Sequence, residues 1–450
     1  MINQCDETHG CSQPLGEALA EQKHVGVRPL SLRVNFSWSL IGNVVYNACQ
    51  WGILSVFNKL GGTESAGLFF LGLTITTPIT AFCSLQLRAV YVTDVKEDYR
   101  FSDYLGTRRI WNLIALVLCV LGAFLYWPSA EQMLIIVAVG VAANIQSSGE
   151  LYVAFFQKKE RMDLLAISSI IKGMLNLLGV VLVFWMTKSV LYAAVSLIVT
   201  RFLAMMLYDR VHAAGLSGLA AEKSIYDWDG IRPCFLQKRI REISSIGLPM
   251  GLTMLMLSLT PQIPRLFLTK YADLSSLGVF GSISYIMIAG TMLMAALGTT
   301  LSPRLARFYE KGDRKSYVRL VKISFLLFLG IGFAAILAVS VFGDFILKLL
   351  YNDEYLGYKG IFMILTCGSV AGFMASIAGY ALTAARYFRV QPLISFGNMM
   401  LVFTFCALWI PDYGIPGAAW GVFVPSVVNM LAFLTVLKIA VDRCGRSFVA

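Results

Sequence analysis

The sequence predicts an all-α polytopic membrane protein of about twelve transmembrane helices, and three observations support this prediction. Hydrophobic residues make up 57% of the chain and charged residues 14%, whereas a soluble domain carries about 25% charged residues. Apolar stretches of about 20 residues, long enough to cross a bilayer as a helix, recur along the whole chain. Lys and Arg gather in alternate loops between these stretches. A transmembrane β-barrel is excluded because its strands are short and alternate in polarity.

The first half of the chain is expected to form an N-terminal six-helix bundle over residues 34–209. A polar segment, residues 1–33, precedes it. This segment lacks the basic start and apolar core of a signal peptide, and we expect it to be a cytoplasmic tail. The six expected spans of the bundle are 34–56, 65–87, 110–127, 132–156, 164–186 and 190–208.

The second half is expected to form a C-terminal six-helix bundle over residues 243–438, after a cytoplasmic linker at 210–242. A second cytoplasmic tail covers residues 439–450. No polar segment exceeds about 35 residues, which is well below ordinary domain size, so we expect no separate soluble domain. The six expected spans are 243–269, 276–301, 323–343, 360–383, 391–410 and 415–437.

The distribution of basic residues predicts the topology. One set of alternate loops, together with both tails, holds about 29 Lys and Arg residues, and the other set holds about 5. The positive-inside rule therefore places both termini in the cytoplasm. The formal net charge of +11 then reflects topology and contact with anionic lipid headgroups. We expect no nucleic-acid partner.

The two halves of the sequence resemble each other. "SAGLFFLGLTITTPITAFCSLQLRAV" from Ser65 aligns with "SLGVFGSISYIMIAGTMLMAALGTTLSPRLARF" from Ser276, and "GELYVAFFQKKERMDLLAISSIIKGMLNLL" from Gly149 aligns with "GYALTAARYFRVQPLISFGNMMLVFTFC" from Gly379. Repeats of six spans share one orientation in the membrane. Transporters built this way bind their substrates between the halves and rock one half against the other. We therefore expect a central cavity between the bundles.

Three charged residues lie well inside the expected spans at one depth. Lys172, Arg201 and Glu150 are each seven or eight residues from the cytoplasmic end of their span, which is roughly 11–12 Å into the membrane at 1.5 Å per residue. We expect Glu150 to pair with one of the two cations, or to serve as an ion-coupling group. Two cations against one acid suit an anionic substrate in a solvated cavity. The alternatives are cations that reach the headgroups, or a structural ion-pair cluster.

Other polar residues extend this candidate site. Arg265 follows two prolines near the external end of its span, where it either reaches outward or faces the cavity. Carboxamides within spans either bond a neighbouring helix or line a cavity. The further substrate-binding candidates are Arg88 at the cytoplasmic mouth, Asn43 and Asn47 on one face of the first span, and Asn176 one turn from Lys172.

The sequence predicts no metal site, cofactor or disulfide. Cys5, His9 and Cys11 cluster in the N-terminal tail, but their spacing fits no standard zinc pattern. The nine cysteines lie in that tail, in apolar spans or in basic loops. None lies in an expected external loop, where an oxidising compartment would favour disulfides.

One stretch of the sequence resembles a known family. "LGGTESAGLFFLGLTITTPITAFCSLQLRAVYVTDVKEDYRFSDYLGTRRI" is similar to the polysaccharide flippases of the multidrug/oligosaccharidyl-lipid/polysaccharide exporter superfamily. The resemblance lies in the Gly-Leu-Phe start of the second span, in Leu87-Arg88-Ala89 at its end, and in the acidic, aromatic loop that leads to Arg108. The two six-span repeats and the basic internal loops extend it over nearly the whole chain.

The resemblance implies a flippase of the bacterial inner membrane. Such proteins move undecaprenyl-pyrophosphate-linked oligosaccharide units to the outer leaflet for O-antigen, capsule or exopolysaccharide assembly, alongside the polymerase and chain-length proteins of the same pathway. The family is also known for cationic residues that line a central cavity. Lys172, Arg201 and Arg265 match that feature by the type of position they hold.

Two other functions remain as alternatives. Drug antiporters of the same superfamily resemble this architecture but typically carry an acidic residue in the first or seventh span, and these spans hold none here. A glycan polymerase or ligase needs an acid or base beside its bound sugar. The expected external loops are short, and His9, His24 and His212 are all expected on the cytoplasmic side. We therefore expect a transporter and not an enzyme.

Overall fold

The computed structural model describes residues 32–94, 98–126, 129–221, 230–287, 290–291, 294, 301, 304–385, 387 and 390–443. This part of the chain is helical and contains no β-strand. Within it, nine helices are long and apolar enough to cross a membrane, and the two longest, Ser37–Thr93 and Val390–Asp442, each contain two of the expected spans. The span expected at 276–301 begins with the shorter apolar helix Leu274–Ile286. The all-α polytopic fold is confirmed.

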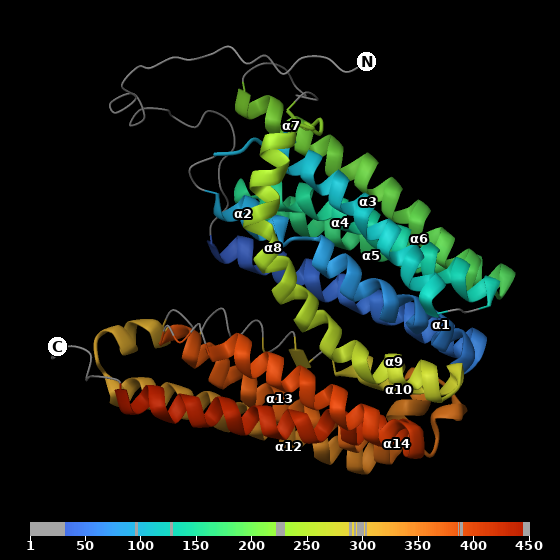
Figure 1. The fold of residues 1–450 in the computed structure, drawn as a ribbon, viewed down its shortest axis with the longest axis vertical. Coiled ribbons are helices and arrows are strands. Elements are labelled where there is room, and N and C mark those ends of the chain that lie inside the picture. The colour runs from blue at the N-terminus through green and yellow to red at the C-terminus, as the bar shows by residue number, and fades with distance from the viewer. Residues whose placement is uncertain are drawn as a thin grey trace.

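The N-terminal bundle contains α1 to α7, coloured blue to green in Figure 1. α1 joins two spans through Gly62, whose φ of 72° lies in the left-handed region that favours glycine. A single π-helical turn, η2, connects α6 to α7. The bounds are α1 Leu32–Cys83, α2 Leu87–Thr93, α3 Phe101–Tyr126, α4 Ala130–Lys158, α5 Met162–Thr187, α6 Val190–Ala204, η2 Met205–Asp209 and α7 Arg210–Ala221.

The C-terminal half follows the same plan of long apolar helices. α14 also joins two spans through a left-handed glycine, Gly414, with a φ of 58°. The bounds are α8 Gln237–Leu259, η3 Thr260–Gln262, α9 Ile263–Tyr271, α10 Leu274–Ile286, α12 Arg314–Leu350, η4 Asp353–Tyr355, α13 Lys359–Ala384 and α14 Val390–Arg443.

Several helices extend beyond the apolar spans on the cytoplasmic side. α3 and α12 begin about nine residues before the expected spans, because helical hydrogen bonds continue through polar residues outside the bilayer. The expected linker at 210–242 is also partly helical, since it contains α7 and the start of α8. Residues 1–31, with Cys5, His9 and Cys11, and residues 444–450 lie outside the described part of the chain.

Helix α8 crosses from one bundle to the other, which sequence reasoning did not anticipate. Figure 1 shows it running diagonally from the N-terminal bundle down to α9. Its first half packs on the N-terminal bundle, where Trp111 Nε1 on α3 donates a 2.9 Å hydrogen bond to Ser244 Oγ and Gly247 lies directly against Leu85. The helix breaks at η3, beside Pro261 and Pro264, and α9 then packs along α14.

The two bundles meet at one end of the molecule. In Figure 1 they come together where α1 approaches α9 and α10, and they separate toward the end where α1 begins and α14 ends. At the meeting point Asn58 Nδ2 donates to Ser282 Oγ over 2.9 Å, Tyr355 Oη donates to Asn58 Oδ1, and the hydroxyls of Thr63 and Ser275 are 2.7 Å apart. The positive-inside rule places this end outside the cytoplasm. The conformation is therefore closed at the external end.

Small residues make this closure possible. A Cβ atom on Gly67 of α1 would lie 1.9 Å from the carbonyl oxygen of Leu274, at the start of α10. A Cβ atom on Gly278 would lie 2.0 Å from the carbonyl oxygen of Thr63. Both distances are far below van der Waals contact, so even a methyl group at either position forces α1 and α10 apart.

We predict that Gly67→Ala opens the external end. The measurement is labelling of Ser282→Cys, in a background without the native cysteines, by a maleimide that does not cross membranes. Ser282 is fully buried, so labelling from outside is expected to be slow when Gly67 is retained. It should be at least about tenfold faster in the Gly67→Ala variant, because local opening exposes the thiol.

The matched control is Gly330→Ala, because nothing lies within 4 Å of a Cβ atom at that position. Equal labelling rates in the Gly67→Ala and Gly330→Ala backgrounds would contradict the assignment of this interface as the external closure.

Candidate functional site

A small polar pocket lies inside the N-terminal bundle, among α1, α4, α5 and α6. It has a volume of about 10 Å³, about the space that one water molecule needs and far below the 300–1,000 Å³ typical of sites that enclose a whole drug-sized ligand. A phosphate or a sugar therefore enters it only when the surrounding helices or side chains move apart. The lining residues are Tyr46, Ile145, Gln146, Gly149, Lys172, Asn176, Arg201 and Met205.

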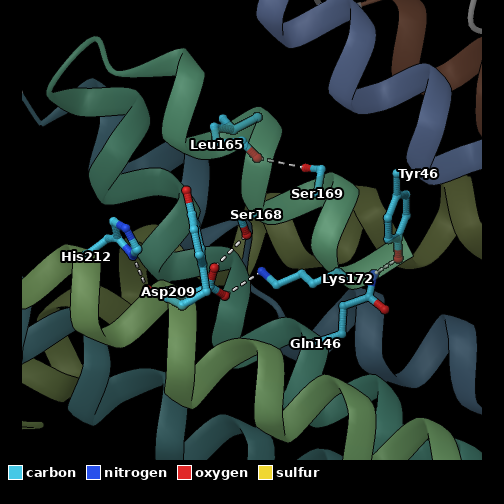
Figure 2. Close-up of polar contacts among 9 residues, drawn as sticks. Tyr46, Gln146, Leu165, Ser168, Ser169, Lys172, Asp209 and His212 are labelled. Carbon is cyan, nitrogen blue, oxygen red and sulfur yellow. Dashed lines mark hydrogen bonds and ion pairs between the residues drawn. The ribbon is translucent and has the colours of Figure 1, made fainter. Parts of the chain in front are cut away.

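The ammonium group of Lys172 forms a buried ion pair at one wall of the pocket. Its Nζ lies 2.5 Å from Asp209 Oδ2, and the two side chains are 14% and 0% exposed. Ser168 Oγ donates a 2.5 Å hydrogen bond to the other carboxylate oxygen, Oδ1. Figure 2 shows Lys172 and Ser168 both pointing at Asp209, with His212 on the side of Asp209 away from Lys172. Both charges are thus satisfied without water, as burial requires.

Local structure brings these two charges together. Asp209 ends the π-helical turn η2, which inserts extra backbone between α6 and α7 and turns the following residues toward a new face. On the opposite side, a Cβ atom on Gly149 of α4 would lie 3.3 Å from both Lys172 Nζ and Asp209 Oδ2. A larger residue at position 149 would push into the pair.

Asp209 corrects the expected charge pattern. The span expected at 190–208 ends one residue before it, which left Asp209 outside the expected spans and Glu150 as the one acidic residue inside a span. In the structure the apolar helix runs on through Gly218, and Lys172 pairs with Asp209 instead of Glu150. The layer at this depth therefore holds two acids, Asp209 and Glu150, for the two cations. A net positive charge at this depth requires further cations.

Glu150 lies beside the pocket without a direct ion-pair partner. It is half-buried, and among the described residues it forms no ion pair with Lys172 or Arg201. Its carboxylate interacts electrostatically with Arg201, Arg108 and Tyr46 without an ion-pair contact. Arg108 is fully buried and donates 2.9 Å hydrogen bonds to the Ser84 carbonyl and to Ser147 Oγ. It adds a third cation close to this layer.

The pocket presents buried donors that have no protein acceptor. Arg201 Nε and Asn176 Nδ2 are both buried without a hydrogen-bond partner in the protein, while Asn176 Oδ1 is occupied by the Thr200 hydroxyl at 2.8 Å. Gln146 Nε2 donates to Tyr46 Oη over 2.8 Å. Each unsatisfied buried donor costs about 1–3 kcal/mol, so a ligand that offers acceptor oxygens here is favoured.

Arg265 faces the interior from the C-terminal half. It is 8% exposed, which excludes the expected alternative of a side chain that reaches outward. Its Nη1 donates to Gln262 Oε1 over 3.2 Å, its guanidinium lies 4.8 Å from the centre of the Phe70 ring on α1, and its Nε has no protein acceptor. Tyr285 on α10 lies within electrostatic range of both Arg265 and Arg201. Arg265 is thus a buried cation at the junction of the two halves.

The remaining candidates lie elsewhere. Arg88 uses its Nε and Nη2 to donate to Gln157 Oε1, over 3.1 and 2.9 Å, within the N-terminal bundle. Asn47 Nδ2 donates to the Asn43 carbonyl over 2.7 Å, and Asn43 is exposed. None of these three residues lines the pocket.

Besides Asp209, which lies behind the pocket, sequence reasoning missed two polar side chains that line it, Tyr46 and Gln146. Tyr46 follows Asn43 by three residues and precedes Gln50 by four, so it lies on the same helical face as the polar stripe of the first span. Gln146 precedes Glu150 by four residues on α4. Helical spacing from the polar residues already chosen could have found both.

Comparisons with known proteins place the chain in context. The profile of the family described as "polysaccharide biosynthesis protein" matches residues 32–309. The capsular polysaccharide biosynthesis protein CapF of Staphylococcus aureus is 25% identical over 399 residues, covering 89% of this chain and 97% of CapF. A protein of Haloferax volcanii described as the probable low-salt glycan biosynthesis flippase Agl15 is 20% identical, covering 86% of this chain and 80% of Agl15.

Solved structures share the fold. The lipid II flippase MurJ in an inward closed conformation superposes with a TM-score of 0.69 and 12% identity, covering 90% of this chain and 89% of MurJ. An inward-facing multidrug resistance transporter of the MATE family superposes with a TM-score of 0.67 and 13% identity, covering 96% of this chain and 99% of that one. At these identities the likeness establishes the architecture of two six-helix halves and nothing about substrate.

We predict that Lys172→Met destabilises the protein at neutral pH, because it leaves the Asp209 carboxylate buried without its cation. Breaking a buried pair in this way costs roughly 3–5 kcal/mol. The midpoint of thermal unfolding in detergent should fall clearly at pH 8 and less at pH 6, where protonation of Asp209 removes the unpaired charge.

The double variant Lys172→Met/Asp209→Asn is the control. Replacing both partners by neutral groups of similar size should recover most of the lost stability at both pH values. A double variant as unstable as the single one would show that packing, and not the charge pair, accounts for the loss.

Proposed function

The chain belongs to the polysaccharide biosynthesis protein family, and from this premise we propose that it is a flippase for undecaprenyl-pyrophosphate-linked glycan units. In this proposal it moves these units from the cytoplasmic to the outer leaflet of a bacterial inner membrane for surface polysaccharide synthesis. One observation carries the proposal. Lys172 and Arg201 share a buried pocket in which Arg201 Nε and Asn176 Nδ2 lack protein acceptors, which suits the oxygens of a pyrophosphate.

The charge balance supports an anionic substrate. The buried or half-buried cations in and around the pocket are Lys172, Arg201, Arg108 and Arg265, and the acids are Asp209 and Glu150. Asp209 is paired with Lys172. The three guanidinium groups then outnumber the one remaining carboxylate, that of Glu150. A phosphate group placed among them gains charge-assisted hydrogen bonds, which are shorter and about twice as strong as neutral ones.

The conformation supports entry from the cytoplasm. The halves are closed by hydrogen bonds at the external end and separate toward the other end (Figure 1). A headgroup that enters from the cytoplasmic leaflet reaches the N-terminal pocket first. Arg265 lies further along, at the junction of the halves. We propose that the diphosphate moves from Lys172 and Arg201 toward Arg265 as the halves rock, while the lipid tail stays in the membrane.

The membrane potential favours this direction of transport. A pyrophosphate diester carries about two negative charges, and each charge moved outward from a negative interior gains roughly 2.3 kcal/mol per 100 mV. Two charges gain roughly 4.6 kcal/mol, which shifts the leaflet distribution more than a thousandfold. The fixed cations lower the barrier to bringing the headgroup inside and do not change this balance over a full cycle. Ion coupling is therefore helpful but not obligatory in this proposal.

An ion-coupled drug antiporter is the second candidate, favoured by the likeness to MATE-family structures. Such a protein needs an acid that is open to a cationic ligand. Residues 32–61 of α1 and residues 243–269 contain no Asp or Glu, and Asp209 does not line the pocket. Glu150 does not line it either. This observation favours the anionic substrate over a cationic drug.

The proposed substrate determines the proposed partners of the protein. The partners are the lipid-linked oligosaccharide and the surrounding lipids, with the polymerase and chain-length proteins of the same pathway acting on the product. The protein itself makes and breaks no covalent bond in this proposal. Release of free undecaprenyl pyrophosphate by the purified protein would contradict this and indicate an enzyme.

We predict that Arg201→Gln abolishes surface polysaccharide in cells that depend on this protein, while its amount in the membrane stays normal. Losing a charge-assisted hydrogen bond of about 1.5–3 kcal/mol weakens headgroup binding roughly 10- to 100-fold. Lys172→Arg should reduce surface polysaccharide less than Lys172→Gln, because the charge is retained although its geometry changes. The measurement is surface glycan, normalised to immunoblotted protein.

Arg307→Gln is the matched control, since Arg307 is exposed on the cytoplasmic side, away from the pocket. It should leave surface glycan unchanged. Normal glycan in the Arg201→Gln strain would refute the proposed role of the pocket, and loss of the protein from the membrane would indicate a structural role instead.

A further inference from the structure

Lys172 separates Asp209 from the pocket. The lysine lines the pocket and is 14% exposed, whereas Asp209 is fully buried behind it and does not line the pocket. Figure 2 shows the Lys172 side chain between Asp209 on one side and Gln146 and Tyr46 on the other, with its ammonium group at the Asp209 end. An anion in the pocket can therefore contact Lys172 but not Asp209, and the two anions compete for one ammonium group.

The surroundings of the Asp209 carboxylate determine how its charge is compensated. The charged or titratable groups that face Asp209 are Lys172 from α5, Tyr152 from α4, Tyr208 from η2 itself and His212 from α7. Ser168 donates one hydrogen bond to it. Among the described residues, Lys172 is the one group in ion-pair contact with Asp209. If Lys172 turns to another anion, the negative charge on Asp209 loses its compensation.

We propose that Asp209 takes up a proton when an anionic headgroup takes over Lys172. This inference rests on the proposed function and adds to it the group that offsets one of the substrate's two negative charges. One proton leaves the aqueous phase and bonds to a carboxylate oxygen of Asp209. The Ser168 hydroxyl remains as its neutral hydrogen-bond partner. A pyrophosphate diester brings about two negative charges and one is neutralised at Asp209, so the layer gains about one net negative charge instead of two.

The position of Asp209 indicates that the proton comes from the cytoplasmic side. η2 leaves the pocket toward α7, which continues to the cytoplasmic linker. His212 lies one turn further along and acts electrostatically on Asp209, while its Nδ1 lies 2.9 Å from the Tyr208 carbonyl. The external end is closed by the interface around Asn58. In this conformation the proton therefore exchanges with the cytoplasmic side.

The proposal predicts the direction in which pH changes the affinity for the anion. Because proton and anion bind together, acidification tightens anion binding. In a cation antiporter the proton and the drug compete for one carboxylate, and acidification weakens drug binding. The direction of the pH effect therefore also separates the two candidate functions.

The test is calorimetric titration of the purified full-length protein in nanodiscs. The probe is a short-chain prenyl pyrophosphate–sugar diester, whose own charge does not change between about pH 5.5 and 8.5, because each phosphate keeps one strongly acidic hydroxyl. Titration in two buffers of different ionisation enthalpy gives the number of protons taken up. We expect about one proton per bound probe at pH 6 and fewer at pH 8, with affinity falling by up to tenfold per pH unit.

Three variants localise the proton. Asp209→Asn should bind the probe without proton uptake and with little pH dependence. Glu150→Gln should keep the uptake. Asp163→Asn, which removes a carboxylate paired with Arg161 at the cytoplasmic end of the same helix as Lys172, is the matched control and should also keep it. If Asp209→Asn does not fold, Asp209→Glu, which retains a titratable group, should fold and keep the uptake.

The outcomes separate this inference from the proposed function. A wild-type protein that binds the probe with no proton uptake, or more tightly as the pH rises, overturns the inference and leaves the flippase proposal intact. Uptake that persists in Asp209→Asn and disappears in Glu150→Gln assigns the proton to Glu150 and also overturns it. No binding of the probe by the wild-type protein at any pH refutes both proposals.

Discussion

The ion pair between Lys172 and Asp209 is the interaction on which the candidate site depends. Leaving either partner alone inside the protein costs roughly 3–5 kcal/mol. Protonating an ordinary aspartate at pH 7 costs about 4 kcal/mol, from three pKa units at 1.36 kcal/mol each. The two costs are similar, so Lys172 can be released to another anion if Asp209 accepts a proton. Gly149, Ser168 and the π-helical turn η2 all maintain this one contact.

The rest of the architecture determines which side of the membrane reaches the pair. Tight contacts between Gly67, Gly278 and the backbone opposite them close the external end. Helix α8 links the two halves, because its first part packs on the N-terminal bundle and its continuation α9 packs along α14. Movement of one half against the other must therefore bend the α8–α9 segment, and its break beside Pro261 provides a place for that bend. Arg265 lies just beyond the break, so rocking of the halves also repositions a buried cation.

Much of the fold could be predicted from the sequence because bilayer thickness requires long apolar helices and because basic residues mark the cytoplasmic loops. The sequence also allows three pocket residues to be predicted, Lys172, Arg201 and Asn176, because a polar group inside an apolar span is easily recognised. Asp209 could not, because a hydropathy reading ends a span at the first acid, and a π-helical turn leaves no pattern in the sequence that would carry the helix past it. The crossing of α8 depends on contacts between distant segments, which local periodicity does not encode.

The most direct test of the account is transport in liposomes by the purified protein, with a fluorescent prenyl-pyrophosphate-linked glycan in the leaflet equivalent to the cytoplasmic one. A potassium–valinomycin potential is imposed, with no pH or sodium gradient. The account predicts that a potential negative on the side of origin drives the lipid to the other leaflet. Reversing the potential should keep the lipid in its original leaflet. The double variant Lys172→Gln/Arg201→Gln should abolish both effects. Transport that ignores the sign of the potential, follows an imposed proton gradient, or moves a zwitterionic lipid equally well would contradict it.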